Sequence, residues 1–316
     1  MLAGMIERIQ AARKALVIGI GGGGDVVGAL AVARLCAALD TPFALGGVAW
    51  ERFAIDPHPG PRSLDQIRDA EPVTAYCVLA TPETTTPEGV RFAEAGVARH
   101  LGDPVALIDV TAGASGAAKG IAGALERLDC DLLLGVDVGG DVLARGQEIG
   151  LASPLCDAVM VAAMLNATAA GDPMLGVIGA GCDGELSTAQ VLERVAALGR
   201  AGAWLGTWGV SPEIAAELEQ VAGDVPTEAS LQVARSARGE IGQAPIRGGR
   251  RLVELGPVEA LTFFFDAAAA ARDLPLVHAV AGSESIEDAR AALAAQGVRT
   301  ELDYERARAA EEGRGK

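Results

Sequence analysis

The stretch Ala15-Leu-Val-Ile-Gly-Ile-Gly-Gly-Gly-Gly-Asp-Val-Val-Gly-Ala-Leu30 decides the fold. An apolar run ends in glycines, and a helical pattern then runs from Asp25 to about Leu39. This order predicts a buried strand, a tight turn and a helix whose first N–H groups are free to bind an anion. The stretch Leu175-Gly-Val-Ile-Gly-Ala-Gly-Cys-Asp-Gly-Glu-Leu186 repeats it. We therefore expect the functional site to be built around these two turns.

Apolar runs and amphipathic segments alternate along the rest of the chain, which is typical of a mainly parallel sheet covered on both faces. The expected strands are residues 15–20, 43–49, 74–80, 105–109, 132–136, 174–179, 203–207 and 276–280. The expected helices are residues 25–39, 87–99, 114–128, 154–169, 186–199, 212–222 and 257–272. The pattern predicts an α/β fold of the Rossmann-like, doubly wound type.

The chain shows no linker rich in Pro, Gly or Ser that is long enough to separate two domains. Residues 1–300 are therefore expected to form a single α/β domain, with a subdivision near residue 170 as the alternative. Residues 56–62, Asp-Pro-His-Pro-Gly-Pro-Arg, predict an extended loop because proline disrupts a helix interior. Residues 301–316 predict a charged C-terminal helix that frays into a disordered tail.

Composition and charge exclude several classes of protein. Of the 316 residues 50% are hydrophobic and only 3% aromatic, which suits close-packed α/β layers. The formal net charge of −16 repels phosphate backbones and anionic lipid, so no nucleic-acid or membrane partner is expected. The five cysteines are scattered singly, and no apolar run resembles a signal peptide or a membrane span. These features predict a cytoplasmic protein and leave homo-oligomerisation open.

Acidic or hydroxyl side chains follow nearly every predicted strand. In an open parallel sheet, ligands bind beyond the carboxyl ends of the strands, so these side chains are expected to share one edge. They are Asp25, Glu51, Glu83, Asp109, Asp137, Asp183, Thr207 and Ser283. Their concentration is the strongest functional signal in the sequence.

Residues 19–24 and 179–184 both fit the GxGxxG pattern of dinucleotide-binding turns. In that interpretation the turns hold a pyrophosphate and Glu51 binds a ribose. However, Asp25 and Asp183 stand where the phosphate would lie, and a carboxylate repels phosphate unless a divalent cation bridges them. The glycines could also serve only as tight turns, with the aspartates as helix caps. We favour a metal or ligand role over a plain dinucleotide site.

The segment Asp137-Val-Gly-Gly-Asp141 begins the richest acidic cluster. Its diglycine turn lets the two carboxylates converge, and Glu148 could reach the same point. Hard oxygen ligands of this kind suit Mg²⁺, Mn²⁺ or Ca²⁺ rather than Zn²⁺. For Asp137 and Asp141 a functional role is favoured over capping. For Ser153 and Asp157 the favoured interpretation is the start of a helix, because Pro154 follows Ser153.

Basic residues are scarce and therefore informative. Arg247, Arg250 and Arg251 surround a diglycine turn, where guanidinium forks could hold a phosphate or a carboxylate. The alternative is a solvated turn whose arginines pair with nearby acidic side chains. Arg52 and Arg62, on either side of the proline-rich loop, could also bind an anion.

The chain contains no Ser-His-Asp order, no GxSxG elbow and no HExxH motif. Only three histidines occur, and His278, at the end of a predicted strand, is interpreted as a core residue rather than a general base. Acid–base chemistry would therefore fall to carboxylates or to metal-bound water.

Taken together, three segments resemble one family. They are Gly19-Ile-Gly-Gly-Gly-Gly-Asp-Val-Val-Gly28, residues 47–62, and residues 135–157 with Gly135-Val-Asp-Val-Gly-Gly-Asp141 and Ser153-Pro-Leu-Cys-Asp157. In their order they resemble the DUF1152 family, whose members have no assigned function. The resemblance spans roughly residues 15 to 285, implies an α/β protein and transfers no catalytic residue. The layout of glycine turns and aspartates is also distantly similar to that of D-glutamate cyclase domains.

These features predict an enzyme that acts on a small phosphorylated or carboxylated metabolite, which could be a nucleotide, by divalent-metal-assisted hydrolysis or elimination. The expected cofactor is Mg²⁺ or Mn²⁺. The metal ligands are expected to be Asp25, Asp137, Asp141 and Asp183, and the catalytic residues Asp141, Asp183 and Glu185. The anion is expected to bind Gly21, Gly22, Gly23, Gly24, Arg52, Gly181, Arg247 and Arg250. The alternatives are an NAD(P)- or nucleotide-binding oxidoreductase and a non-catalytic ligand sensor.

Overall fold

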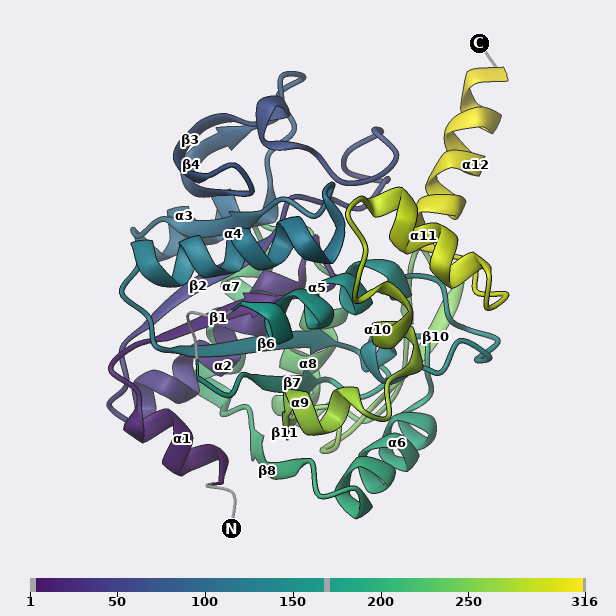
Figure 1. Ribbon diagram of the computed structural model, residues 1–316. Coiled ribbons are helices and arrows are strands. Elements are labelled where there is room, and N and C mark those ends of the chain that lie inside the picture. Colours follow the sequence, from purple (N-terminus) through teal and green to yellow (C-terminus); the bar gives the residue numbers. More distant parts are fainter. Residues whose placement is uncertain (1–3, 168–170, 315–316) are drawn as a thin grey trace.

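The computed structural model describes residues 4–167 and 171–314, and within these ranges the centre of the molecule is a nine-stranded sheet (Figure 1). The strands lie side by side in the order β3 (Arg68–Thr74), β4 (Cys77–Thr85), β5 (Val105–Ile108), β2 (Phe43–Val48), β1 (Ala15–Gly19), β6 (Leu132–Val138), β7 (Met174–Ile178), β11 (Leu261–Asp266) and β8 (Trp204–Gly209).

The middle of this sheet is parallel. Strand β1 pairs in parallel with β2 on one side and with β6 on the other, and β5 and β7 extend the parallel region outward. The chain builds one half of the sheet from β1 to β5 and then crosses to the other half at β6. The loops after β1 and β6 therefore diverge at the topological switch point, where α/β sheets bind ligands. This arrangement confirms the predicted Rossmann-like α/β fold.

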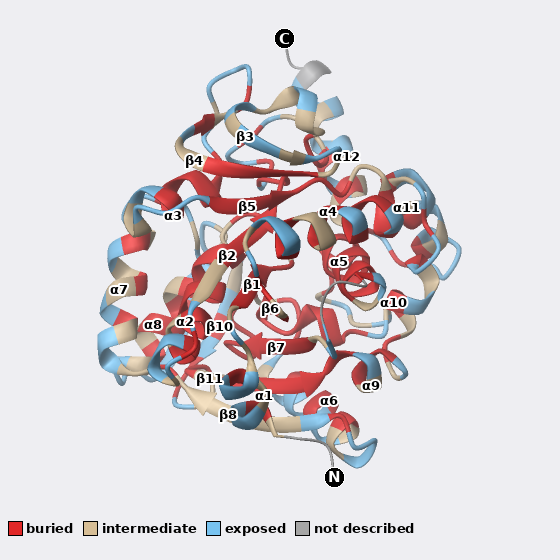
Figure 2. Ribbon diagram, turned by 60° about the vertical axis from the view of Figure 1, so that its left-hand side comes forward, coloured by how far each residue is buried: buried red, intermediate tan, exposed pale blue. Residues whose placement is uncertain are grey.

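Alternate side chains of the buried strand β1 pack into two separate cores. Ala15 and Val17 face the core formed with α1 (Met5–Ala11), α2 (Asp25–Ala38), α3 (Ala93–Leu101), α7 (Pro212–Ala222) and α8 (Ala229–Ala237). Leu16 and Ile18 face the core formed with α4 (Gly113–Arg127), α5 (Pro154–Asn166), α6 (Thr188–Arg200), α9 (Ala267–Ala271), α10 (Pro275–Val280) and α11 (Ile286–Ala294). Figure 2 shows the buried central strands between helices whose outer faces are exposed.

Gly28 lets α2 pack closely on the end of β6. A Cβ atom at Gly28 would lie 2.3 Å from Cγ2 of Val138. We expect Gly28→Ala to lower the free energy of unfolding by about 1–3 kcal/mol, as overpacking does, in urea titrations. The matched control is Gly199→Ala in α6, where the nearest atom would be 3.7 Å away. There alanine should raise the free energy of unfolding by up to about 1 kcal/mol, because its helix propensity is higher. Equal effects at the two positions would contradict this account of the packing.

Several elements outside the parallel region were predicted wrongly. Residues 276–280 belong to helix α10, with Pro275 in its first turn, so Ser283 does not follow a strand. Residues 257–272 are mostly the antiparallel strand β11 followed by the short helix α9. Residues 74–80 span the turn of the antiparallel β3–β4 hairpin, and Glu83 lies within β4 rather than beyond a carboxyl end. The helix expected from residue 87 begins at Ala93.

Residues 242–255 form a second, two-stranded sheet that was not predicted. Its strands β9 (Gly242–Ile246) and β10 (Arg251–Leu255) pair antiparallel, and the arginine-rich turn joins them. Short 3₁₀ helices, η1 (Leu64–Gln66) and η2 (Asp141–Leu143), complete the secondary structure described here.

The C-terminal helix is longer than expected. Helix α12 (Glu301–Arg314) includes residues 311–314, which the sequence assigned to a disordered tail. Residues 315 and 316 and residues 168–170 lie outside the described residues. The end of the helix expected at 154–169 and the alternative domain boundary near 170 fall in this second range. Over the described ranges, no helix has both the length and the hydropathy that crossing a bilayer demands.

Candidate functional site

Three buried aspartates from separate elements meet at the switch point of the sheet. Asp25 begins α2 after the glycine turn, Asp137 lies near the end of β6, and Asp157 lies in the first turn of α5. One carboxylate oxygen from each lies within 4.8 Å of the others. We call Asp25, Asp137 and Asp157 the aspartate triad. This separation is short enough for one ion to contact all three carboxylates.

Three of the six carboxylate oxygens of the aspartate triad are buried and have no hydrogen-bond partner among the described residues. Asp137 is only 1% exposed, and neither of its carboxylate oxygens has a partner in the described part of the chain. Oδ1 of Asp157 is likewise buried and unpartnered. Asp25 accepts a hydrogen bond from the Gly21 N–H at 3.0 Å. Buried carboxylates without donors are costly, so the geometry calls for a bound cation or for protons.

A second acidic group lies beside the triad. It consists of Asp141, Asp183 and Glu185, which again place one oxygen each within 4.8 Å of one another, and we call it the Glu185 cluster. Glu185 is fully engaged: it accepts from the Ala152 and Ser153 N–H groups at 2.6 and 2.8 Å and from the Ser153 hydroxyl at 2.6 Å. Oδ2 of Asp183 is buried and unpartnered. Asp183 is therefore open to a ligand, whereas Glu185 is held by the protein.

Burial and mutual repulsion change the proton affinities of these acids. Desolvation raises the pKa of Asp25 to about 6 and that of Asp183 to about 7. Desolvation, and then the charges of neighbouring acids, raise the pKa values of Asp137, Asp141 and Asp157 well above the usual range. For Glu185 burial also acts to raise the pKa, but Arg247, Ser153 and Arg52 outweigh it and lower the pKa. Glu185 is thus the permanent anion of its cluster.

Two arginines lie near these acids. Nη2 of Arg247 donates to Oε1 of Glu185 at 2.7 Å. The side chain of Arg52 lies against Gly23, where an added Cβ would be 3.3 Å from its Cγ. Arg52 is exposed, and no described residue forms an ion pair or a hydrogen bond with its guanidinium. Desolvation acts to lower the pKa of Arg52, but the charges of Asp25, Glu185 and Asp141 outweigh it and raise the pKa. Arg52 is therefore available to bind an anion.

The other predicted basic residues have local partners. Arg250 is exposed, and its Nε donates to the carbonyl of Arg247 at 2.9 Å, on its own turn. Arg251 donates to the carbonyls of Gly184 and Gly150 and so fixes the hairpin onto the loop that carries Glu185. Arg62 is buried and pairs with Asp56 at 2.8 Å. The structure brings Arg52 and Arg247 to the acids.

The glycine turns are occupied by protein groups. The Gly21 N–H donates to Asp25, and the Gly23 N–H donates to the Trp50 carbonyl at 2.9 Å. The side chain of Thr227 leaves no space for a Cβ at Gly24, with Oγ1 at 2.4 Å from that position. In the second turn the Gly181 N–H donates to the Gly139 carbonyl at 2.6 Å. These contacts take up donors that a pyrophosphate would need.

Other candidate residues are accounted for by structure. Oε1 of Glu51 accepts from the Ala93 N–H at 2.6 Å and so caps α3, a role that competes with binding a ribose. Glu148 accepts from the N–H groups of residues 145–147 in its own loop. His278 is exposed on α10, so its interpretation as a core residue is wrong.

The family model described as "Protein of unknown function (DUF1152)" matches residues 16–309. That range is most of the chain and contains both acidic clusters. The chain belongs to the DUF1152 family. No curated protein and no solved structure matches it. The distant similarity to D-glutamate cyclase domains is not confirmed by these comparisons.

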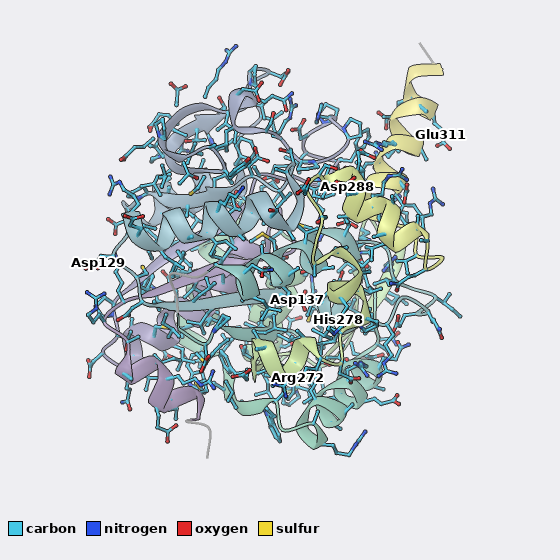
Figure 3. All side chains as sticks on the ribbon, in the orientation of Figure 1. Asp129, Asp137, Arg272, His278, Asp288 and Glu311 are labelled. Carbon is cyan, nitrogen blue, oxygen red and sulfur yellow. The ribbon has the colours of Figure 1, made fainter. Side chains whose placement is uncertain are left out.

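In this DUF1152 chain the sequence did not predict that Asp157 lies with Asp25 and Asp137, because Asp157 was interpreted as part of a helix start. Ser153 does not cap α5 with its side chain, and every residue from Pro154 to Met164 is buried. A carboxylate in a helix that is buried on all sides cannot reach solvent, so it needs a partner inside the protein. The apolar residues on all sides of Asp157 were the signal that could have indicated this. Figure 3 labels Asp137, the triad member near the end of β6.

Proposed function

We propose that this protein is a divalent-cation-dependent enzyme that hydrolyses, or eliminates a group from, a small phosphorylated or carboxylated metabolite. The aspartate triad would hold Mg²⁺ or Mn²⁺, because hard oxygen ligands suit these ions. The single observation that carries the proposal is Asp137, which lies between two further carboxylates and whose two buried carboxylate oxygens have no hydrogen-bond partner in residues 4–167 and 171–314.

The anionic group of the substrate would bind between the cation and Arg52. Arg52 has no partner among the described residues and lies beside the glycine turn that ends at Asp25. A guanidinium fork matches phosphate and carboxylate oxygens, and the cation would offset the charge of the triad. A bound cation would also polarise the substrate and lower the pKa of a coordinated water.

Proton transfer would fall to the Glu185 cluster. Asp183 has a pKa raised to about 7 by burial and an unpartnered Oδ2, which suits a general acid–base at neutral pH. Glu185 would act by holding Ser153 and Arg247 in place rather than by exchanging a proton. In this proposal Asp141 and Asp183, which the sequence predicted as metal ligands, take part in acid–base chemistry instead. Asp157 joins Asp25 and Asp137 as a metal ligand.

A turnover assay with matched variants tests the function. Wild-type protein and Asp183→Asn would be incubated with phosphate monoesters, nucleotides and hydroxycarboxylates, with Mn²⁺ or with EDTA. We expect turnover with Mn²⁺ and none with EDTA, and with Mn²⁺ we expect turnover by Asp183→Asn to be about 10²–10⁴-fold lower than by wild type, the usual contribution of a general acid–base. Ligand binding without turnover of any class would instead support the non-catalytic sensor.

The effect of the cation on stability should depend on pH. Burial raises the pKa of folded Asp25 to about 6, and those of Asp137 and Asp157 are also raised. Protons therefore stabilise the metal-free fold at low pH, and this contribution is lost as pH rises through the folded pKa values. A cation replaces the protons at higher pH. We expect the increase in Tm with Mn²⁺ to be small near about pH 5 and to grow toward about pH 8. An increase that is constant with pH would contradict this.

A further inference from the structure

The start of α12 is fixed against the body of the protein. Thr300 and Asp303 exchange hydrogen bonds in a capping arrangement, with the Thr300 N–H donating to Asp303 at 3.0 Å. Leu302 is 1% exposed and belongs to the core shared with α5. Glu301 and Glu305 are one turn apart and share a face of the helix. Further along, α12 stands away from the body, as Figure 1 shows.

Glu301 caps helix α5 from a distant part of the chain. Its carboxylate accepts from the Leu155 N–H at 3.0 Å and from the Cys156 N–H at 2.7 Å. Cys156 directly precedes Asp157 of the aspartate triad. The residue that would ordinarily cap α5 is Ser153, but its hydroxyl donates to Glu185 and lies 3.3 Å from Oδ2 of Asp141. Because Glu301 supplies the cap, Ser153 is released to join the Glu185 cluster.

Glu305 holds the loop that carries Arg52. Its Oε2 accepts from the Trp50 indole N–H at 3.2 Å and from the Gly60 N–H at 2.7 Å. These two contacts join the two ends of the segment 50–60, which contains Arg52. Trp50 also provides the carbonyl that accepts from the Gly23 N–H. Glu305 therefore contacts the loop at residues that lie before and after Arg52.

We propose that α12 is a positioning element of the site, in which Glu301 sets Asp157 for the cation and Glu305 sets Arg52 for the anion. This inference rests on the proposed function. Neither glutamate would touch the substrate, so both are positioning residues. Residues that orient ligands in this way typically change metal affinity by about 10–100-fold when replaced.

Two binding measurements separate this proposal from a purely structural role. Mn²⁺ affinity and the affinity for inorganic phosphate at saturating Mn²⁺ would be measured by calorimetry for wild type, Glu301→Ala, Glu305→Ala and the control Glu311→Ala. Glu311 is exposed near the far end of α12, where Figure 3 labels it. Thermal melts would verify that each variant is folded during the titrations. Glu301→Gln keeps one acceptor oxygen and serves if Glu301→Ala does not fold.

The expected result is a split between the two affinities. Glu301→Ala should weaken Mn²⁺ binding by about 10-fold or more and change phosphate binding by less than about 3-fold, while Glu305→Ala should do the reverse. Glu301→Gln should lie between wild type and Glu301→Ala, and Glu311→Ala should match wild type. Variants with a lower Tm but unchanged affinities, or with both affinities weakened alike, would overturn the inference. Wild-type protein that binds no Mn²⁺ would overturn the proposed function, and this inference with it.

Discussion

Asp137→Asn is expected to abolish the binding of divalent cations while leaving the metal-free fold at least as stable as wild type. Both oxygens of Asp137 are buried and have no hydrogen-bond partner among the described residues, so its charged form is unfavourable in the empty fold and is stabilised only by a bound cation. Loss of a direct ligand should exceed the roughly 10–100-fold effect of outer-shell changes on metal affinity. Mn²⁺ titration followed by calorimetry and by thermal shift measures both consequences.

The matched control for this substitution is Asp129→Asn, which makes the same chemical change at an exposed carboxylate (Figure 3). It should leave Mn²⁺ affinity within about 2-fold of wild type, because exposed ion pairs contribute little. If Asp137→Asn kept wild-type Mn²⁺ affinity, the triad would not be a cation site. If it strongly destabilised the metal-free protein, the assignment of Asp137 as an unpartnered acid would be wrong.

Arg52→Met is expected to separate anion binding from cation binding. The substitution removes the one guanidinium near the triad that has no partner among the described residues and keeps a side chain of similar length. Phosphate affinity at saturating Mn²⁺ should fall by about 10–100-fold, the equivalent of roughly 1.5–3 kcal/mol for hydrogen bonds to a charged group. Mn²⁺ affinity should stay the same or increase, because a positive charge near the cation is lost.

Two further arginine variants complete that comparison. Arg200→Met, at an exposed position at the end of α6, should change neither affinity. Arg250→Met tests the sequence-based prediction that Arg250 also binds the anion, and the contact of Arg250 with its own turn leads us to expect less than about 2-fold change in phosphate affinity. Equal losses in Arg52→Met and Arg200→Met would show that net charge, rather than a built anion site, governs phosphate binding.

The parallel half of the fold was predictable because its strands are buried on both faces. Such strands appear as continuous apolar runs, as in Leu16–Ile18 and Leu132–Leu134, and β1, β2, β5, β6 and β7 were all found near their predicted positions. Two of the antiparallel strands outside this region, β3 and β11, were not predictable in the same way. The sequence of β3 is polar and mostly exposed, and β11 is flanked by alanines that suggested one long helix. Tertiary pairing decided those segments.

The candidate site shows the same division. The acids at the carboxyl ends of β1, β6 and β7 were predicted because chain order places those ends on one edge. Their partition into two clusters was not, because it depends on which turn each aspartate faces. Glu301 and Glu305 were placed in a charged helix of no assigned role, since their partners lie about 145 and 245 residues away in sequence. No local pattern reports contacts of that range.

The most direct test of the central claim is anomalous diffraction from crystals of the protein grown with Mn²⁺. The account predicts one strong anomalous peak bounded by Asp25, Asp137 and Asp157, with metal–oxygen distances of about 2.0–2.2 Å, the range typical of small divalent ions bound by carboxylates. The triad without an anomalous peak, and with its carboxyl groups paired to one another through shared protons, would contradict it.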